Sequence, residues 1–169
     1  MGEAVTDPEA SEDGALMGNG NAEHASLPGD VLATAETFVN AVAWGEHHVV
    51  WDLLADEGRE TVLRVAATRG MDHALATRLR DGTAAGEERD EFLVDLVNGL
   101  RADLAGNDLD ALDFVADAEA PGPGRARVVM MTPLPEPLAV GGGLPVGSLE
   151  LVEEGGRWRV ERIVPRLAQ

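Results

Sequence analysis

The sequence predicts an α+β protein in which N-terminal helices pack on a curved antiparallel sheet of about four strands. Two observations predict this class. Between residues 30 and 105, apolar side chains recur at three- and four-residue steps, which is typical of amphipathic helices. After that, the pattern changes to alternation of apolar and polar residues between Gly- and Pro-rich turns. Four or five helices are therefore expected to precede two β-hairpins.

Two regions divide the chain. Residues 1–29 contain acidic residues, no basic residue, and mostly small side chains. Such a segment buries too little apolar surface to offset the entropy of ordering, so we predict a disordered acidic tail that aids solubility. A tail that binds a basic partner is the less favoured alternative. Residues 30–169 are predicted to form a single α+β domain.

The helical region contains five predicted segments. The first begins after Asp30, whose carboxylate can cap it, and continues to Trp44. The next three cover residues 46–54, 59–69 and 72–80. The last and most regular covers residues 87–105, with Thr83 or Gly86 as its cap and acidic residues in its first turn.

The C-terminal region contains four predicted strands. Residues 112–117 and 125–132 form one hairpin, and residues 146–152 and 157–164 form the second. The turn Glu153-Glu154-Gly155-Gly156 joins the second pair. Residues 133–145 are rich in Pro and Gly and are predicted to be a long loop between the hairpins.

Charge and composition narrow the classes of function. The formal net charge is −18, and the 13 basic residues are all arginine. An anionic surface repels phosphate backbones and anionic lipids, so neither nucleic acid nor a membrane is expected as a partner. An acidic surface that mimics nucleic acid is an alternative, and it requires carboxylates gathered on one face. The absence of lysine is typical of a bacterial genome of high GC content, or of a salt-adapted surface.

Other absences bear on location and cofactors. The chain has no cysteine, which excludes disulfides and cysteine-ligated metals. The N-terminus has neither a basic nor an apolar segment of the kind found in secretory signals, and no apolar run is long enough to span a membrane. We therefore expect a cytoplasmic protein, and we predict neither a cofactor nor a metal site.

The ends of the folded region resemble one superfamily. In AETFVNAVAWGEHHVVWDLLADEGR a helix ends in a Gly-acid turn and the next carries Trp-x-Leu-Leu, which resembles the start of nuclear-transport-factor-two-like domains of the cystatin-like α+β type. The closing GRWRVERIV resembles their last strand. The resemblance covers residues 33–59 and 148–164. It implies a cone-shaped sheet around a cavity, often a homodimer through the sheet, and members with and without catalysis.

His48 and Asp52 are the candidate catalytic residues. On a helix they are four residues apart and share a face, so the carboxylate could orient the imidazole for general base catalysis, or both could bind a metal. The favoured alternative is that Asp52 lies with Glu46 and His47 on the solvated side of an amphipathic helix while His48 lies at the edge of its apolar stripe, because the sequence identifies no third partner.

Large aromatic residues and one arginine are candidate ligand-binding residues. Trp51, Phe114 and Trp158 could line a pocket, although large aromatics at amphipathic positions usually belong to the core. Arg162 has the same parity as Trp158 in the last strand, so alternation points it toward the apolar side. There it would need a carboxylate or a ligand as partner.

The other sheet arginines admit two interpretations. Arg125, Arg127, Arg157 and Arg159 could meet an anionic ligand, but pairing with Glu150, Glu153 and Glu161 on neighbouring strands is favoured.

These observations favour a non-catalytic binding or interaction module. Its expected partners are a second copy bound through the sheet, a small apolar ligand or another protein. The alternative is a small cyclase- or isomerase-like cavity enzyme that uses His48 and Asp52 as an acid–base pair.

Overall fold

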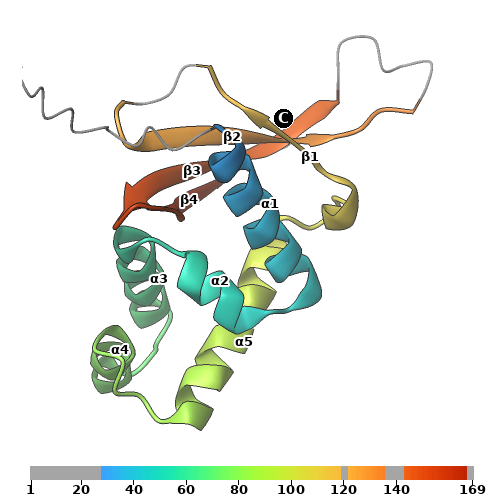
Figure 1. Cartoon of the computed structure of the whole chain (residues 1–169). Coiled ribbons are helices and arrows are strands. Elements are labelled where there is room, and N and C mark those ends of the chain that lie inside the picture. Colours follow the sequence, from blue (N-terminus) through green and yellow to red (C-terminus); the bar gives the residue numbers. More distant parts are fainter. Residues whose placement is uncertain (1–27, 119–121, 136–142, 167–169) are drawn as a thin grey trace, which may run out of the picture.

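The α+β architecture is confirmed. The computed structural model describes residues 28–118, 122–135 and 143–166. Within them, five α-helices precede a four-stranded antiparallel sheet, and Figure 1 shows the helices gathered on one face of that sheet. None of these helices combines the length and apolar character required to cross a membrane.

The helices follow the predicted order with small shifts at their ends. Asp30 lies in the first turn of the first helix instead of capping it, because that helix begins two residues earlier. The five helices and a short 3₁₀ helix are α1 (Pro28–Trp44), α2 (His47–Leu53), α3 (Asp56–Thr68), α4 (His73–Arg80), α5 (Gly86–Asp103) and Leu109–Ala111. Asp72 caps α4, since its carboxylate accepts hydrogen bonds from the N–H groups of Ala74 at 2.6 Å and Leu75 at 3.2 Å.

The cap of α5 differs from the prediction. Ala85 occupies the N-cap position instead of Thr83 or Gly86. Its side chain has no acceptor, so the helix end relies on Glu88, whose carboxylate accepts from the Ala85 N–H at 3.3 Å. Of the predicted acidic tail, residues 28 and 29 belong to α1, and residues 1–27 lie outside the described residues.

The sheet is a meander. Its strands are β1 (Asp113–Ala116), β2 (Arg125–Thr132), β3 (Leu144–Glu154) and β4 (Arg157–Pro165), and their order in space is the order in sequence. Every neighbouring pair is antiparallel. The two predicted hairpins are thus confirmed. Pairing of β2 with β3 joins them into one sheet. Of the Pro/Gly loop between these strands, residues 136–142 lie outside the described residues.

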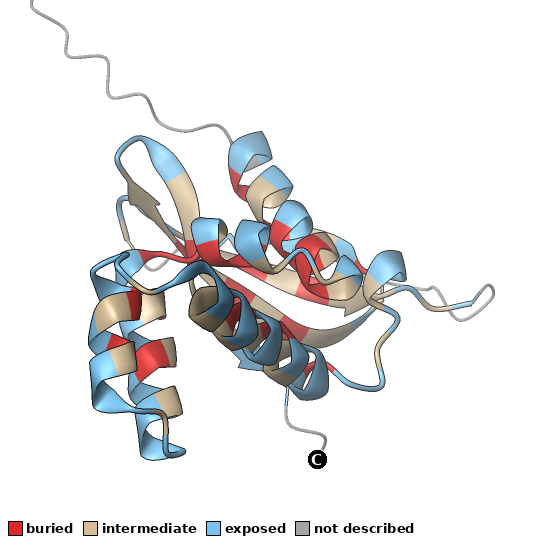
Figure 2. Ribbon diagram, turned by 90° about the horizontal axis from the view of Figure 1, so that it is seen from below, coloured by how far each residue is buried: buried red, intermediate tan, exposed pale blue. Residues whose placement is uncertain are grey.

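One core fills the space between helices and sheet. Figure 2 shows the buried residues along the faces where helices meet the sheet. Helix α1 contributes Ala35, Phe38, Val39 and Val42, all fully buried. The sheet contributes alternate residues, as the period of a strand requires: Val128 and Met130, Leu149 and Leu151, and Val160.

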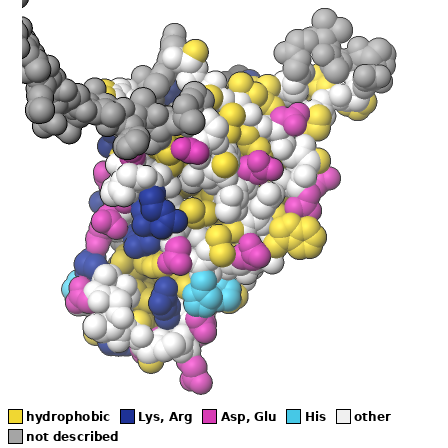
Figure 3. Space-filling view, viewed as in Figure 1, with side chains coloured by type: hydrophobic (Ala, Val, Ile, Leu, Met, Phe, Trp, Pro, Cys, Tyr) yellow, Lys and Arg dark blue, Asp and Glu magenta, His cyan; other side chains and the backbone are white. Residues whose placement is uncertain are grey.

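The surface charge is mixed on one side of the molecule. On the face seen in Figure 3, acidic side chains are scattered among arginine and apolar side chains. A protein that mimics nucleic acid would gather its carboxylates, so this face does not have the feature that the mimic hypothesis requires.

Candidate functional site

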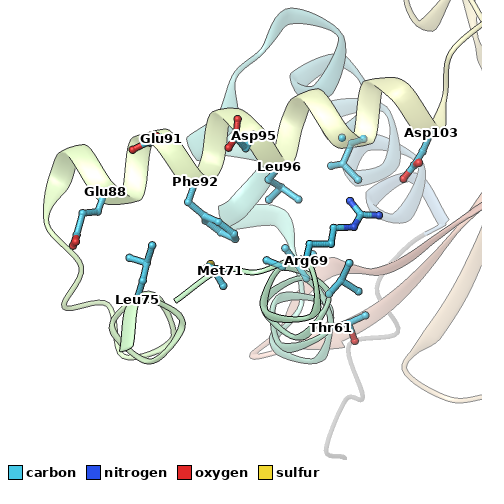
Figure 4. A pocket seen from close by; sticks show the side chains of 15 residues that line it. Thr61, Arg69, Met71, Leu75, Glu88, Glu91, Phe92, Asp95, Leu96 and Asp103 are labelled. Atoms are coloured by element: carbon cyan, nitrogen blue, oxygen red, sulfur yellow. The ribbon is translucent and has the colours of Figure 1, made fainter. Parts of the chain in front are cut away.

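A groove lies between three helices in the described part of the chain. It encloses about 780 Å³. In Figure 4, α5 runs along one side, and α3 and α4 are seen nearly end-on along the other. Its lining residues are Thr61, Val62, Val65, Ala66, Arg69, Met71, Leu75, Glu88, Glu91, Phe92, Asp95, Leu96, Gly99, Leu100 and Asp103.

The groove exists because α5 has a wide apolar stripe. Leu93 and Val97 are buried in the core, whereas the neighbouring Phe92, Leu96 and Leu100 are only partly buried and face the groove. Helix α5 packs mainly on α2 and α1, while α3 packs on α4 and β4. Because neither of these main packings places α3 against α5, part of the apolar stripe stays open between them.

The rim of the groove is acidic. Helix α5 contributes Glu88, Glu91, Asp95 and Asp103, and Arg69 follows the last residue of α3. Glu88 is paired with Arg78 at 2.7 Å. No ion pair within the described residues neutralises Glu91, Asp95 or Asp103. An apolar floor beside unpaired carboxylates suits a ligand that is apolar on one side and cationic on its edge.

A smaller pocket of about 420 Å³ lies deeper among α2, α3, α4 and α5. Trp51 lines it and is 8% exposed. The indole packs edge-to-face on Phe92, with ring centroids 5.8 Å apart, and the Arg59 guanidinium lies 5.3 Å from its ring centroid. Trp51 is therefore held as part of the helical core.

The predicted acid–base pair is not assembled around a pocket. His48 and Asp52 are both exposed, and neither lines the groove or the smaller pocket. His48 Nε2 instead lies 3.2 Å from Oδ1 of Asp90 on α5. The backbone carbonyl of Asp52 accepts hydrogen bonds from Arg59 and Arg159. Asp52 is thus on the solvated side, as the favoured alternative expected, whereas His48 is exposed instead of lying at the edge of the apolar stripe.

Arg162 does not point to the apolar side, and that expectation was wrong. The register changes between Glu150 and Leu151, which pair with Arg162 and Val160, so Glu161 is an extra residue in β4. This β-bulge moves the residues after it to the opposite face. The Arg162 side chain is 65% exposed and its Nε lies 3.6 Å from a Glu150 carboxylate oxygen.

Phe114 and Trp158 belong to the sheet side of the core. Both are partly buried against the main apolar cluster, and neither lines the groove or the smaller pocket. The indole Nε1 of Trp158 is buried without a hydrogen-bond partner. The four candidate ligand-binding residues, Trp51, Phe114, Trp158 and Arg162, thus do not gather around either hollow.

Cross-strand pairing with the predicted glutamates is confirmed for Arg125 and Arg127. Arg125 and Glu161 form two hydrogen bonds of 2.5 and 3.1 Å across β3. Arg127 lies 3.3 Å from Glu150. These contacts account for Arg125 and Arg127 without an anionic ligand.

Comparisons with models of protein families, with curated proteins and with solved structures found no match to this chain. The resemblance to nuclear-transport-factor-two-like domains stays a prediction. The groove is lined by residues of α3, α4, α5 and the α3–α4 connection, and the smaller pocket by residues of α2 to α5 and the α4–α5 connection.

Sequence analysis missed the acidic side of the groove, although a signal was present. Glu88, Glu91 and Asp95 are three and four residues apart, which places them along one flank of the Phe92 and Leu96 stripe. Their position beside apolar residues that stay partly exposed follows only from the packing of α3 and α4.

Proposed function

We propose that the protein is a non-catalytic cytoplasmic binding module, and that its groove between α3, α4 and α5 receives an amphipathic helix with basic flanks from a partner protein. The observation that carries this proposal is the apolar floor along α5 bordered by the unpaired carboxylates of Glu91, Asp95 and Asp103. The cytoplasmic location is an expectation from the sequence.

The length of the groove favours a helix as the occupant. Its lining on α5 runs from Glu88 to Asp103, which at 1.5 Å per residue is about 22 Å. A helix of four turns has this length and could place apolar residues at positions i, i+3 or i+4, and i+7 against Phe92, Leu96 and Leu100. A compact small molecule would contact only part of this stripe.

The charge of the rim favours a basic flank. Carboxylates at Glu91, Asp95 and Asp103 attract arginine or lysine side chains and repel an acidic helix. Because these groups are exposed to solvent, their attraction is screened by salt, and binding should weaken as ionic strength rises.

Fluorescence anisotropy with two labelled peptides tests the proposal. One is an amphipathic peptide of about 16 residues with leucines on one face and arginines on both flanks, and the other carries glutamates in place of the arginines. We expect binding of the first alone. Asp95→Arg should weaken it about tenfold or more, and Leu96→Arg should abolish it.

Asp110→Arg is the matched control, since Asp110 is an exposed acid outside the groove. It should change the dissociation constant less than about twofold. Failure of the basic peptide to bind, or equal binding of both peptides, would contradict the proposal. Binding of a neutral apolar dye that neither peptide displaces would indicate a small-molecule site instead.

A homodimer through the uncovered sheet face remains a second part of the proposal. The exposed Val115 of β1 and Val164 of β4 give this face some apolar surface. Size-exclusion chromatography with light scattering would measure the molar mass of the protein in solution. If the protein is a dimer, Val115→Arg should shift it toward monomer. A monomer at all concentrations would remove this part of the proposal and leave the groove unaffected.

A further inference from the structure

We propose that His47, His48 and Asp90 form a binding site for a divalent transition-metal ion such as Zn²⁺. Each residue offers one ligand atom, and these three atoms all lie within 4.8 Å of one another. The inference does not rest on the proposed groove, since none of the three residues lines it.

The chemistry of the three groups fits a borderline metal ion. Zn²⁺ binds imidazole nitrogen and carboxylate oxygen at about 2.0–2.2 Å, so two ligands of a tetrahedral site are about 3.4 Å apart. His48 Nε2 and Asp90 Oδ1 are already 3.2 Å apart. A His47 nitrogen lies within 4.8 Å of both atoms, so a small shift of the side chain would bring it to the same ion, and water would fill the remaining position.

The backbone orients His47 for this role. Its Nδ1 lies 3.4 Å from the carbonyl oxygen of Gly45. A proton on Nδ1 is directed at that carbonyl, which leaves Nε2 as the nitrogen with a free lone pair. Ligating histidines in metal sites are commonly held in this way by a carbonyl or carboxylate.

The three ligands come from two helices that pack together. His47 and His48 begin α2, Asp90 lies in the second turn of α5, and the two helices are in contact. The imidazole rings of His47 and His48 are also close together, with their centroids 4.3 Å apart. An ion bound here would link α2 to α5 and should raise the melting temperature of the protein.

The site is open to solvent and belongs to an acidic molecule. The side chains of His48 and Asp90 are 53% and 54% exposed, and Figure 3 shows histidine side chains at the surface over α2. The net charge of −18 raises the local concentration of cations around the molecule. A divalent ion can therefore reach the three groups without any rearrangement of the core.

The test is a titration of the untagged full-length protein with ZnCl₂. Isothermal titration calorimetry and competition with a chromophoric chelator would measure the affinity and the number of ions bound. We expect one ion per chain, and no comparable binding of Mg²⁺, which prefers oxygen ligands. His48→Ala and Asp90→Asn should each weaken Zn²⁺ binding by about tenfold or more.

His73→Ala is the matched control, because His73 is an exposed histidine at the start of α4 and outside the cluster. It should leave the affinity unchanged. Equal melting temperatures of all variants in a chelator would show that they fold alike. Absence of saturable binding, or the same affinity in His48→Ala, Asp90→Asn and the unaltered protein, would overturn the proposal.

Discussion

Gly58 in α3 lies against the carbonyl oxygen of Val160 in β4. A Cβ atom added at Gly58 would be 3.1 Å from that oxygen and 2.9 Å from the carbonyl oxygen of Glu161. The helix comes this close because the Ala55 N–H donates to the Val160 carbonyl at 2.8 Å and Leu54 forms a parallel bridge with Val160. The start of α3 therefore protects the edge of the sheet, and only glycine allows this approach.

Gly58→Ala should destabilise the protein by about 1–3 kcal/mol, although alanine favours helices, because the methyl group meets backbone that cannot move alone. Urea denaturation would measure the loss. Gly99→Ala in α5 is the control, because no atom lies within 4 Å of its added Cβ. It should stabilise by about 0.5–1 kcal/mol, and similar losses in both variants would contradict the explanation.

Arg125→Gln should destabilise the protein, because it leaves the Glu161 carboxylate without its partner. The Glu161 side chain is only 7% exposed, and both of its oxygens accept from Arg125. The double variant Arg125→Gln with Glu161→Gln removes the buried charge together with its partner. In denaturant melts it should be more stable than Arg125→Gln alone, and an additive loss would refute this account.

The β-bulge at Glu161 in β4 marks the limit of sequence-based prediction. Alternation predicted all four strands, because a half-buried strand has to alternate. It placed Arg162 on the wrong face, since one extra residue at Glu161 inverts the parity of everything after it. No residue type in β4 predicts a bulge at this position.

The candidate site was less predictable than the fold. Helical spacing placed His48 beside Asp52, but its actual partner, Asp90, lies on another helix, and only tertiary packing of α2 on α5 brings the two together. The groove likewise depends on how α3 and α4 stand relative to α5. Local periodicity determines which face of a helix is apolar and leaves open how much of that face is covered.

Glu60 and Arg80 provide a contact whose strength depends on pH. Hydrogen bonds of 2.5 and 3.0 Å from the Arg80 guanidinium lower the pKa of Glu60 from its ordinary value of 4.5. A carboxyl group with a lowered pKa in the folded state contributes stability above its ordinary pKa and loses it as pH falls through the folded value. The pair joins α3 to the end of α4, so it stabilises the packing of these two helices.

Glu60→Gln should therefore cause a small loss of stability at pH 7 that disappears as the solution is acidified below about pH 4. The loss is small because both side chains are about half exposed and water screens the pair. Thermal melts of both proteins across a pH series would measure the difference. Arg80→Gln should follow the same curve, and a difference that grows on acidification would have the wrong sign.

Arg101 in α5 closes the C-terminal end of α1. Its Nε donates to the Val42 carbonyl at 2.8 Å and its Nη2 to the Ala43 carbonyl at 2.6 Å. The last carbonyls of a helix have no partners within it and carry partial negative charge. Gly45, with φ of +78°, turns the chain away just beyond them.

Arg101→Met keeps the apolar stem but removes both donors and the charge, so it should destabilise the protein by about 1–2 kcal/mol. Arg101→Lys keeps the charge and can satisfy one carbonyl, which predicts an intermediate loss because the planar fork is missing. Hydrogen exchange in the last turn of α1, measured beside urea denaturation, would locate the effect. If lysine matched methionine, the paired geometry of the guanidinium would account for the whole contribution; if lysine matched arginine, the charge alone would suffice.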